Sequence, residues 1–131
     1  MIIDNNLLDE VTRQATESPR LRMNFNLHDS LEAKAQRLLN VLLPGTEVPV
    51  HRHMHTAETY VLLRGKMAVV FYNDFGQQTA RFLLDPMKGN YGVQIPKGQW
   101  HGIEVLEPST IFEVKDGPYT PLTPADILSV R

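Results

Sequence analysis

The stretch from residue 37 to residue 116 breaks up into short apolar segments, each of which ends at or near a glycine or a proline. The segments read "RLLNVLL", "TYVLLRG", "KMAVVFY", "TARFLL", "YGVQIP", "HGIEVLE" and "PSTIFEVKD". Short strands at this close spacing are typical of an antiparallel sandwich or barrel. The loop "NDFGQ" fits a hairpin in which Gly76 takes a positive φ angle. These features predict an all-β domain.

The first part of the chain follows a different pattern. Apolar residues at nearly helical spacing predict a short helix over residues 4–17, which Asp4 or Asn5 caps. Residues 20–28 alternate apolar and polar side chains, as in a strand with one buried face. The segment "DSLEAKAQ" fits a turn of helix, and "EVPVHRHMH" alternates like a strand up to His55.

The length of 131 residues predicts one domain. We expect three parts, namely a helix and strand extension (1–43), a β-barrel (44–118) and a C-terminal tail packed on the barrel (119–131). The net charge is −2 with both signs spread along the chain, which argues against a nucleic-acid partner. The chain has no cysteine, which excludes disulfides, thiolate metal sites and cysteine nucleophiles. Without a long apolar run or a signal-peptide pattern, we expect no membrane insertion and a cytoplasmic location.

The most unusual feature is "HRHMHTAETY" at residues 51–60, which holds three of the five histidines at alternate positions. Glu58 follows them, and His101 comes later, after a Pro-x-Gly turn. Three imidazoles and a carboxylate form a donor set that suits one divalent transition metal: iron (Fe), manganese (Mn), nickel (Ni), zinc (Zn) or cobalt (Co). Four protein ligands on an octahedral ion would leave two positions for water or substrate. A chance surface patch of histidines is the alternative.

Strand geometry limits which of the neighbouring histidines can share one ion. Side chains two positions apart are separated by ~7 Å and those four apart by ~13–14 Å, so the pair is His51 with His53 or His53 with His55. The second choice leaves only Thr56-Ala57 before the glutamate, and a two-residue hairpin favours Gly, Asn or Asp instead. We therefore predict that the first pair binds the metal. His55 would then lie at the barrel mouth, where it either donates a hydrogen bond to a metal-binding side chain or contacts the substrate.

Two motifs resemble those of the cupin superfamily. The first has the spacing Gly45-x5-His51-x-His53-x4-Glu58-x6-Gly65, and the second is carried by Pro96-x-Gly98-x2-His101. The second motif departs from the family pattern in two ways. The glycine that usually begins it is matched only approximately, by Gly89 or Gly92, and Val105 stands where the family usually has asparagine. The resemblance implies a cupin double-stranded β-helix, a jelly-roll-like barrel, that holds a divalent metal. It also implies four metal ligands, which are His51, His53, Glu58 and His101.

A narrower resemblance covers most of the chain. The segments "RMNFNLH", "QRLLNVLLPGTEVPVHRHMHTAETYVLLRGKM", "IPKGQWHGIEVL" and "FEVKDGPY" are similar to the WbuC-like cupin metalloproteins of bacterial surface-polysaccharide (O-antigen) gene clusters. The resemblance brings no settled reaction. An ion with open positions in a small barrel suggests a metal-dependent isomerase, epimerase or oxygenase that acts on a small polar metabolite. The gene clusters of the family favour a sugar or nucleotide sugar as that metabolite. A non-catalytic sensor or binding module, which uses the ion to hold a carboxylate or diol, is the alternative. Fold class alone does not separate the two.

Three further residues are candidates for catalysis. Tyr60 shares strand parity with the predicted ligand Glu58 and should point into the same interior. Glu113 and Lys115 alternate on the last strand, where they form either a surface ion pair or an acid/base pair in the pocket.

The remaining predictions concern pocket contacts and assembly. Asn24 and Asn26 belong to the polar face of the early strand, which is either a solvated edge or a source of ligand contacts. Trp100 could line the pocket mouth, whereas His28 is expected to be a surface or hydrogen-bonded residue. The partners we expect are a small-molecule ligand and a second copy of the chain, because the strand near residues 20–28 would leave an exposed edge in a monomer.

Overall fold

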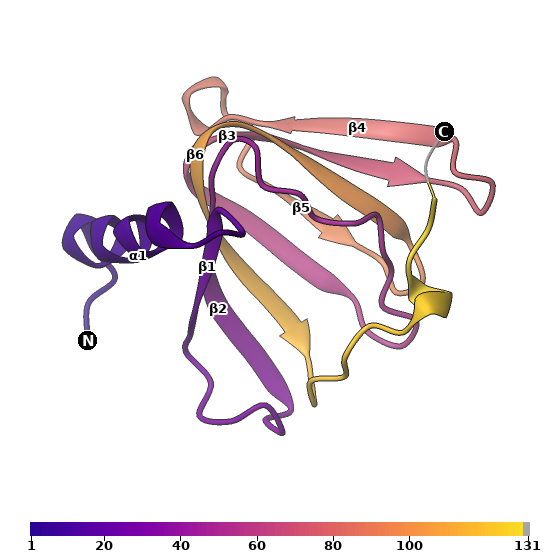
Figure 1. The fold of residues 1–131 in the computed structure, drawn as a ribbon, viewed down its shortest axis with the longest axis horizontal. Coiled ribbons are helices and arrows are strands. Elements are labelled where there is room, and N and C mark those ends of the chain that lie inside the picture. The colour runs from indigo at the N-terminus through magenta and orange to yellow at the C-terminus, as the bar shows by residue number, and fades with distance from the viewer. Residues whose placement is uncertain (130–131) are drawn as a thin grey trace.

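The computed structural model describes residues 1–129 and has one α-helix and six β-strands in that range (Figure 1). They are α1 (Asn5–Glu17), β1 (Arg22–Asn26), β2 (Ala35–Leu42), β3 (Glu58–Tyr72), β4 (Gln78–Leu84), β5 (Gly92–Ile95) and β6 (Trp100–Asp116), with single-turn 3₁₀ helices at Pro86–Lys88 and Pro124–Asp126. No helix within residues 1–129 has the length and apolar character needed to cross a membrane.

The predicted N-terminal helix is confirmed. Asp4 caps it, because its side chain accepts a hydrogen bond of 3.0 Å from the backbone N–H of Leu7. The buried face of α1 consists of Leu8, Val11 and Ala15, of which the last two belong to a small apolar cluster together with Val41 of β2 and Leu43 just after it. The helix therefore covers one end of the sheet, as its place beside β1 and β2 in Figure 1 shows.

The turn of helix predicted for "DSLEAKAQ" is wrong. The segment forms bends and turns that lead into β2. The side-chain amide of Gln36 donates hydrogen bonds to the carbonyls of Leu31 and Ala33, at 3.2 and 2.9 Å. These side-chain bonds stabilise the turns in place of a helical ladder.

All strand pairs are antiparallel, and the ladder runs in the order β1-β2-β6-β3-β4, with β5 beside the first part of β3. The predicted all-β jelly-roll architecture is confirmed. The sheet is not a closed barrel, because β1 and β4 lie at the two ends of the described ladder. The outer edge of β1 is therefore unpaired within residues 1–129, and the homodimer expected there stays a prediction.

The long strands β3 and β6 each contribute to two layers of the fold. The first half of β3 and the second half of β6 lie with β1, β2 and β5, whereas their other halves lie with β4. The segment pattern predicts one strand before and one after Gly65, and likewise one before and one after Pro108. In the structure each of these two pairs is a single continuous strand. The register shifts around Gly65, whose φ angle is 103°, and a Cβ atom there would overlap the carbonyl oxygen of Pro108. Gly and Pro therefore mark bends at which paired strands pass from one layer to the other, and do not end the strands.

The strand predicted to run up to His55 is also wrong. Residues 47–57 form an irregular connection in which only His51 makes a β-bridge, on one side to His101 and on the other to Ile127. The C-terminal tail holds this connection from outside, since the N–H of Leu128 donates to the carbonyl of Val50 at 2.9 Å. The histidine segment is therefore fixed by its neighbours on both sides.

Candidate metal centre

The first pair of candidate ligands is brought together by the β-bridge between His51 and His101. Each backbone N–H donates to the other residue's carbonyl, at 3.0 and 2.9 Å. Residues that face each other across an antiparallel bridge point to the same side, and the two imidazole rings lie 4.4 Å apart between centroids. Two residues far apart in the sequence thus present their rings to one point.

Glu58 and His53 complete the cluster. Glu58 is the first residue of β3 and is only 2% exposed, while His53 comes from the irregular connection. Oε1 of Glu58 lies 2.7 Å from Nε2 of His53 and 3.7 Å from Nε2 of His101. Candidate ligand atoms of His51, His53 and Glu58 all lie within 4.8 Å of one another, so that small side-chain movements would bring them to the bond lengths of one ion.

Backbone carbonyls fix the orientation of two of the imidazoles. Nδ1 of His51 donates to the carbonyl of Pro49 at 2.8 Å, and Nδ1 of His101 donates to the carbonyl of Gln99 at 2.9 Å. Because a carbonyl only accepts, each Nδ1 carries the proton and each Nε2 has a free lone pair. Metal-binding histidines are commonly held in this way.

Two buried polar atoms of the cluster are poorly satisfied by residues 1–129. Nε2 of His101 is inaccessible to solvent and has no hydrogen-bond partner among them, and Oε1 of Glu58 is equally buried, with only the 2.7 Å contact to Nε2 of His53. A buried polar atom without a partner is unfavourable by roughly 1–3 kcal/mol. A metal ion would satisfy both atoms at once, so the residues present fit a metal site.

The protonation states also suit metal binding. Burial lowers the pKa of His51 to about 4 and also lowers the pKa of His101. Burial alone would raise the pKa of Glu58, but its contact with His53 and the charges of the neighbouring histidines and Lys115 lower the pKa to about 2. Near neutral pH His51 and His101 are therefore neutral imidazoles and Glu58 is a carboxylate, which are the forms that bind metals.

The cluster opens into an inner cavity of about 240 Å³. The register of β6 and β3 places Lys115 opposite Glu58 and Glu113 opposite Tyr60, so that all four side chains share one face of the sheet. Nζ of Lys115 lies 3.7 Å from Oε2 of Glu113, which is buried, so this pair is not on the surface. Burial, and next the charge of Glu58, raise the pKa of Glu113 to about 7, and burial raises the pKa of Tyr60.

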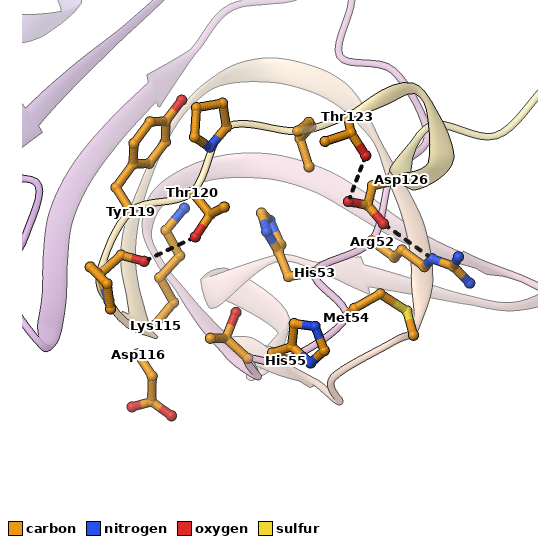
Figure 2. Close-up of a pocket in the computed structure, with 14 residues that line it drawn as sticks. Arg52, His53, Met54, His55, Lys115, Asp116, Tyr119, Thr120, Thr123 and Asp126 are labelled. Atoms are coloured by element: carbon orange, nitrogen blue, oxygen red, sulfur yellow. Dashed lines mark hydrogen bonds and ion pairs between the residues drawn. The ribbon is translucent and has the colours of Figure 1, made fainter.

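A second, outer cavity of about 260 Å³ lies between the histidine segment and the C-terminal tail (Figure 2). It is lined by His55, which is exposed, and by Thr120 and Asp126 of the tail. His53 and Lys115 line both cavities, and Figure 2 shows them between the tail and the loop that carries His55. The metal cluster therefore lies at the junction of the two cavities.

The other predicted site residues differ in their positions. Asn24 lines the inner cavity, whereas Asn26 is exposed and lines neither cavity. Trp100 also lines neither, because its indole N–H donates to Asp74 at 2.8 Å and its ring stacks on the guanidinium of Arg52 at 4.2 Å. His28 is hydrogen-bonded as expected, with Nδ1 3.1 Å from the backbone nitrogen of Arg37.

Sequence reasoning missed two contributors to the inner cavity. Asn40 is the single polar side chain in the apolar segment "LLNVLL", a signal that could have marked it. The tail residues Tyr119, Thr120 and Leu122 also line this cavity, whereas the sequence predicted only that the tail packs on the barrel.

A family model described as "Domain of unknown function (DUF6016)" matches residues 3–84, which make up more than half of the chain. The matched region includes His51, His53 and Glu58, whereas His101 lies beyond it. No curated protein matches the chain.

Several solved structures share its fold. The capsular polysaccharide assembling protein CapF from Staphylococcus aureus has a TM-score of 0.66 at 19% identity, covering 79% of this chain and 28% of CapF. The cupin domain of Schizosaccharomyces pombe Cnp3 has a TM-score of 0.58 at 16% identity, covering 72% of this chain and 64% of that one. TT1209 from Thermus thermophilus has a TM-score of 0.61 at 23% identity, covering 88% and 97% of the two chains. The chain spans less than two thirds of the first two structures, and it has a cupin fold.

Proposed function

The chain belongs to the DUF6016 family, a domain of unknown function, and from that premise we propose that it is a cupin metalloprotein that acts on a small polar metabolite. The ligands in this proposal are His51, His53, Glu58 and His101. The observation that carries it is the convergence of these side chains around two buried atoms: Nε2 of His101, which lacks a hydrogen-bond partner among residues 1–129, and Oε1 of Glu58, which lies 3.7 Å from it. A divalent transition ion bound there would polarise a carbonyl or activate a water molecule.

We favour an enzyme, and among enzymes an isomerase or epimerase. These reactions require groups that move protons, and Glu113 and Lys115 line the same cavity as the ligands without belonging to the ligand set. Tyr60 lies opposite Glu113 and provides a hydroxyl beside it. A binding module that only holds a ligand would not need a buried carboxylate and an ammonium group beside the metal, which supports catalysis over the sensor alternative.

The proposed substrate is a sugar-like molecule of small size. The inner cavity of about 240 Å³ has room for about eight water molecules, which is less than the roughly 300–1,000 Å³ of typical ligand pockets. A free monosaccharide or its derivative suits this volume better than a nucleotide sugar. The resemblance to WbuC-like cupins, and the fold shared with a capsular polysaccharide assembling protein, support a role in surface-polysaccharide metabolism.

Metal analysis tests the first part of the proposal. Purified protein should contain close to one equivalent of a transition metal, lose it to a chelator and rebind it. His53→Ala should lose the metal without unfolding, because this side chain is 19% exposed, and His55→Ala is the matched control that should keep it. Less than about a tenth of an equivalent in wild type, with no rebinding, would contradict the proposal.

Turnover assays test the second part. Glu113→Gln should keep the metal and ligand binding but lose turnover of any monosaccharide that stabilises the metal-loaded protein in a thermal-shift screen. Ligands that bind without turnover, in air and under reducing conditions, would favour the sensor.

A further inference from the structure

Two arginines line one wall of the inner cavity. This wall is the one that lies farthest from the metal cluster along the sheet. Arg20 precedes β1 and Arg22 begins it, and both line the cavity that contains the candidate ligands. Neither forms an ion pair with a carboxylate among residues 1–129, whereas Lys115 of the same cavity has Glu113 at 3.7 Å. The cavity therefore has two cationic groups whose charge is not balanced by the described part of the chain.

Arg22 is held in place by the connection that follows β2. Its Nη1 donates to the hydroxyl of Thr46 at 3.3 Å and to the carbonyl of Glu47 at 2.9 Å. The same Thr46 hydroxyl donates to the backbone carbonyl of Arg20 at 2.7 Å, so that one loop holds the side chain of Arg22 and the backbone of Arg20. Nε and Nη2 of Arg22 have no hydrogen-bond partner among residues 1–129, which leaves donors for a ligand.

The electrostatic environment of Arg22 is unfavourable without an anion. Partial burial, and next the neighbouring charge of Arg20, lower the pKa of Arg22. A carboxylate or phosphate between the two guanidinium groups would relieve this repulsion and accept charge-assisted hydrogen bonds. Arginine is well suited to this role, because its planar group binds two oxygens of such an anion.

Polar amides lie between the arginines and the metal cluster. The register places Asn24 of β1 opposite Asn40 of β2, and both line the cavity. Oδ1 of Asn40 is buried and has no hydrogen-bond partner among residues 1–129, while Nδ2 lies 3.4 Å from Oε1 of Glu113. A hydroxyl of a bound ligand is the natural donor for this free oxygen.

We propose that Arg20 and Arg22 form an anion subsite, and that the ligand of this protein is a small hydroxylated anion. Its carboxylate or phosphate binds the arginines, a hydroxyl reaches Asn40, and an oxygen at the other end faces the metal ligands. This inference rests on the proposed function for the metal end of the molecule. Three strand spacings separate β1 from β3, about 14 Å along the sheet, so the anionic group and the metal-facing oxygen are several bonds apart.

Matched ligand pairs test the subsite in metal-loaded protein by isothermal titration. Ribose 5-phosphate should bind about ten- to hundredfold tighter than ribose, or glucuronate than glucose, the range expected for charge-assisted hydrogen bonds. The phosphate and carboxylate pairs show which anion is preferred. Arg22→Gln and Arg20→Gln should each reduce this preference about tenfold without changing metal content. Arg37→Gln, which removes an exposed arginine of β2 outside both cavities, should leave the preference intact.

The outcomes separate this inference from the metal proposal. Equal binding of the charged and neutral members of both pairs, or an anion preference that survives in both arginine variants, would overturn the anion subsite. Protein that binds no metal but still prefers anions through Arg22 would overturn the metal centre and support the subsite. Tight binding of a short chelating acid such as glycolate, unchanged by Arg22→Gln and without a preference in the sugar pairs, would contradict the proposed spacing.

Discussion

The β3–β6 pair has two halves that share one backbone arrangement but bury opposite kinds of side chain. In one half, Met67 lies opposite Val105 and Val69 opposite Ile103, and Met67 and Val69 are fully buried in the apolar core. In the other half the interior positions farthest from Gly65 hold charged and hydroxyl groups, which are Glu58, Tyr60, Glu113 and Lys115, and only the Leu62–Ile111 pair continues the apolar core. Strand pairing is antiparallel throughout, so backbone hydrogen bonding does not explain the difference.

The contrast indicates how the fold divides its tasks. Burying apolar side chains stabilises the folded state, whereas burying polar groups is unfavourable unless each finds a partner. Glu58 of the polar half is buried, and its Oε1 faces Nε2 of His101 at 3.7 Å, an atom of the other half that no described residue satisfies. We therefore expect the apolar half to supply stability and the polar half to gain it only when an ion or a ligand is bound.

The largest effect should come from the apolar half. Met67→Ala removes a side chain with no exposed surface and should lower the free energy of unfolding by about 2–5 kcal/mol. Metal content per folded molecule should not change, because the variant leaves the ligands intact. Urea denaturation combined with metal analysis measures both quantities. A loss below about 1 kcal/mol would show that the apolar half does not carry the stability.

Metal binding should stabilise the polar half by a somewhat smaller amount. At a free metal concentration about 100 times the Kd, the free energy of unfolding should rise by about 2.7 kcal/mol. His53→Ala should lose this increment, while Met67→Ala should show it in full because Met67 does not line the inner cavity and is not a candidate ligand. Denaturation of metal-free and metal-loaded samples checks the increment. An equal gain in His53→Ala would place the metal elsewhere.

The junction between the halves should be sensitive to one methyl group. Gly65→Ala introduces a Cβ that overlaps the carbonyl of Pro108 at a φ angle of 103°, and we expect a loss of roughly 1–3 kcal/mol. Because β3 and β6 run through the bend into both layers, a distortion there should destabilise both layers together. Unfolding should therefore remain one cooperative transition. Urea melts followed by tryptophan fluorescence and circular dichroism test this. A stable variant with two separate transitions would mean that the layers are independent.

The smallest effect should come from the histidine that the metal does not use. His55 is exposed in the outer cavity, so His55→Ala should change the free energy of unfolding by no more than about 0.5 kcal/mol. It should also keep the full metal content. A metal-free His55→Ala beside a fully loaded His51→Ala would reverse the ligand assignment.

Much of the fold could be predicted because it depends on local patterns. The spacing of apolar residues and the cap at Asp4 identified α1, and the Gly and Pro turns identified a β-rich chain. The boundaries of β3 and β6 were misplaced, since Gly65 and Pro108 read as ends of strands. Gly65 and Pro108 approach each other across the β3–β6 ladder, and the strands bend where they meet. The local sequence around either residue does not show that the other lies opposite.

The sequence by itself determined the types of donor, the spacing of the histidine segment and the absence of thiolate chemistry, because these depend only on which residues stand near one another in the chain. Tertiary structure alone decided which groups share a cavity. The bridge from His51 to His101, the position of Asn40 opposite Asn24, and the approach of Arg22 all depend on the register of distant strands. Register is set by the packing of the whole sheet, so the ligand-binding wall could not be derived from any one segment.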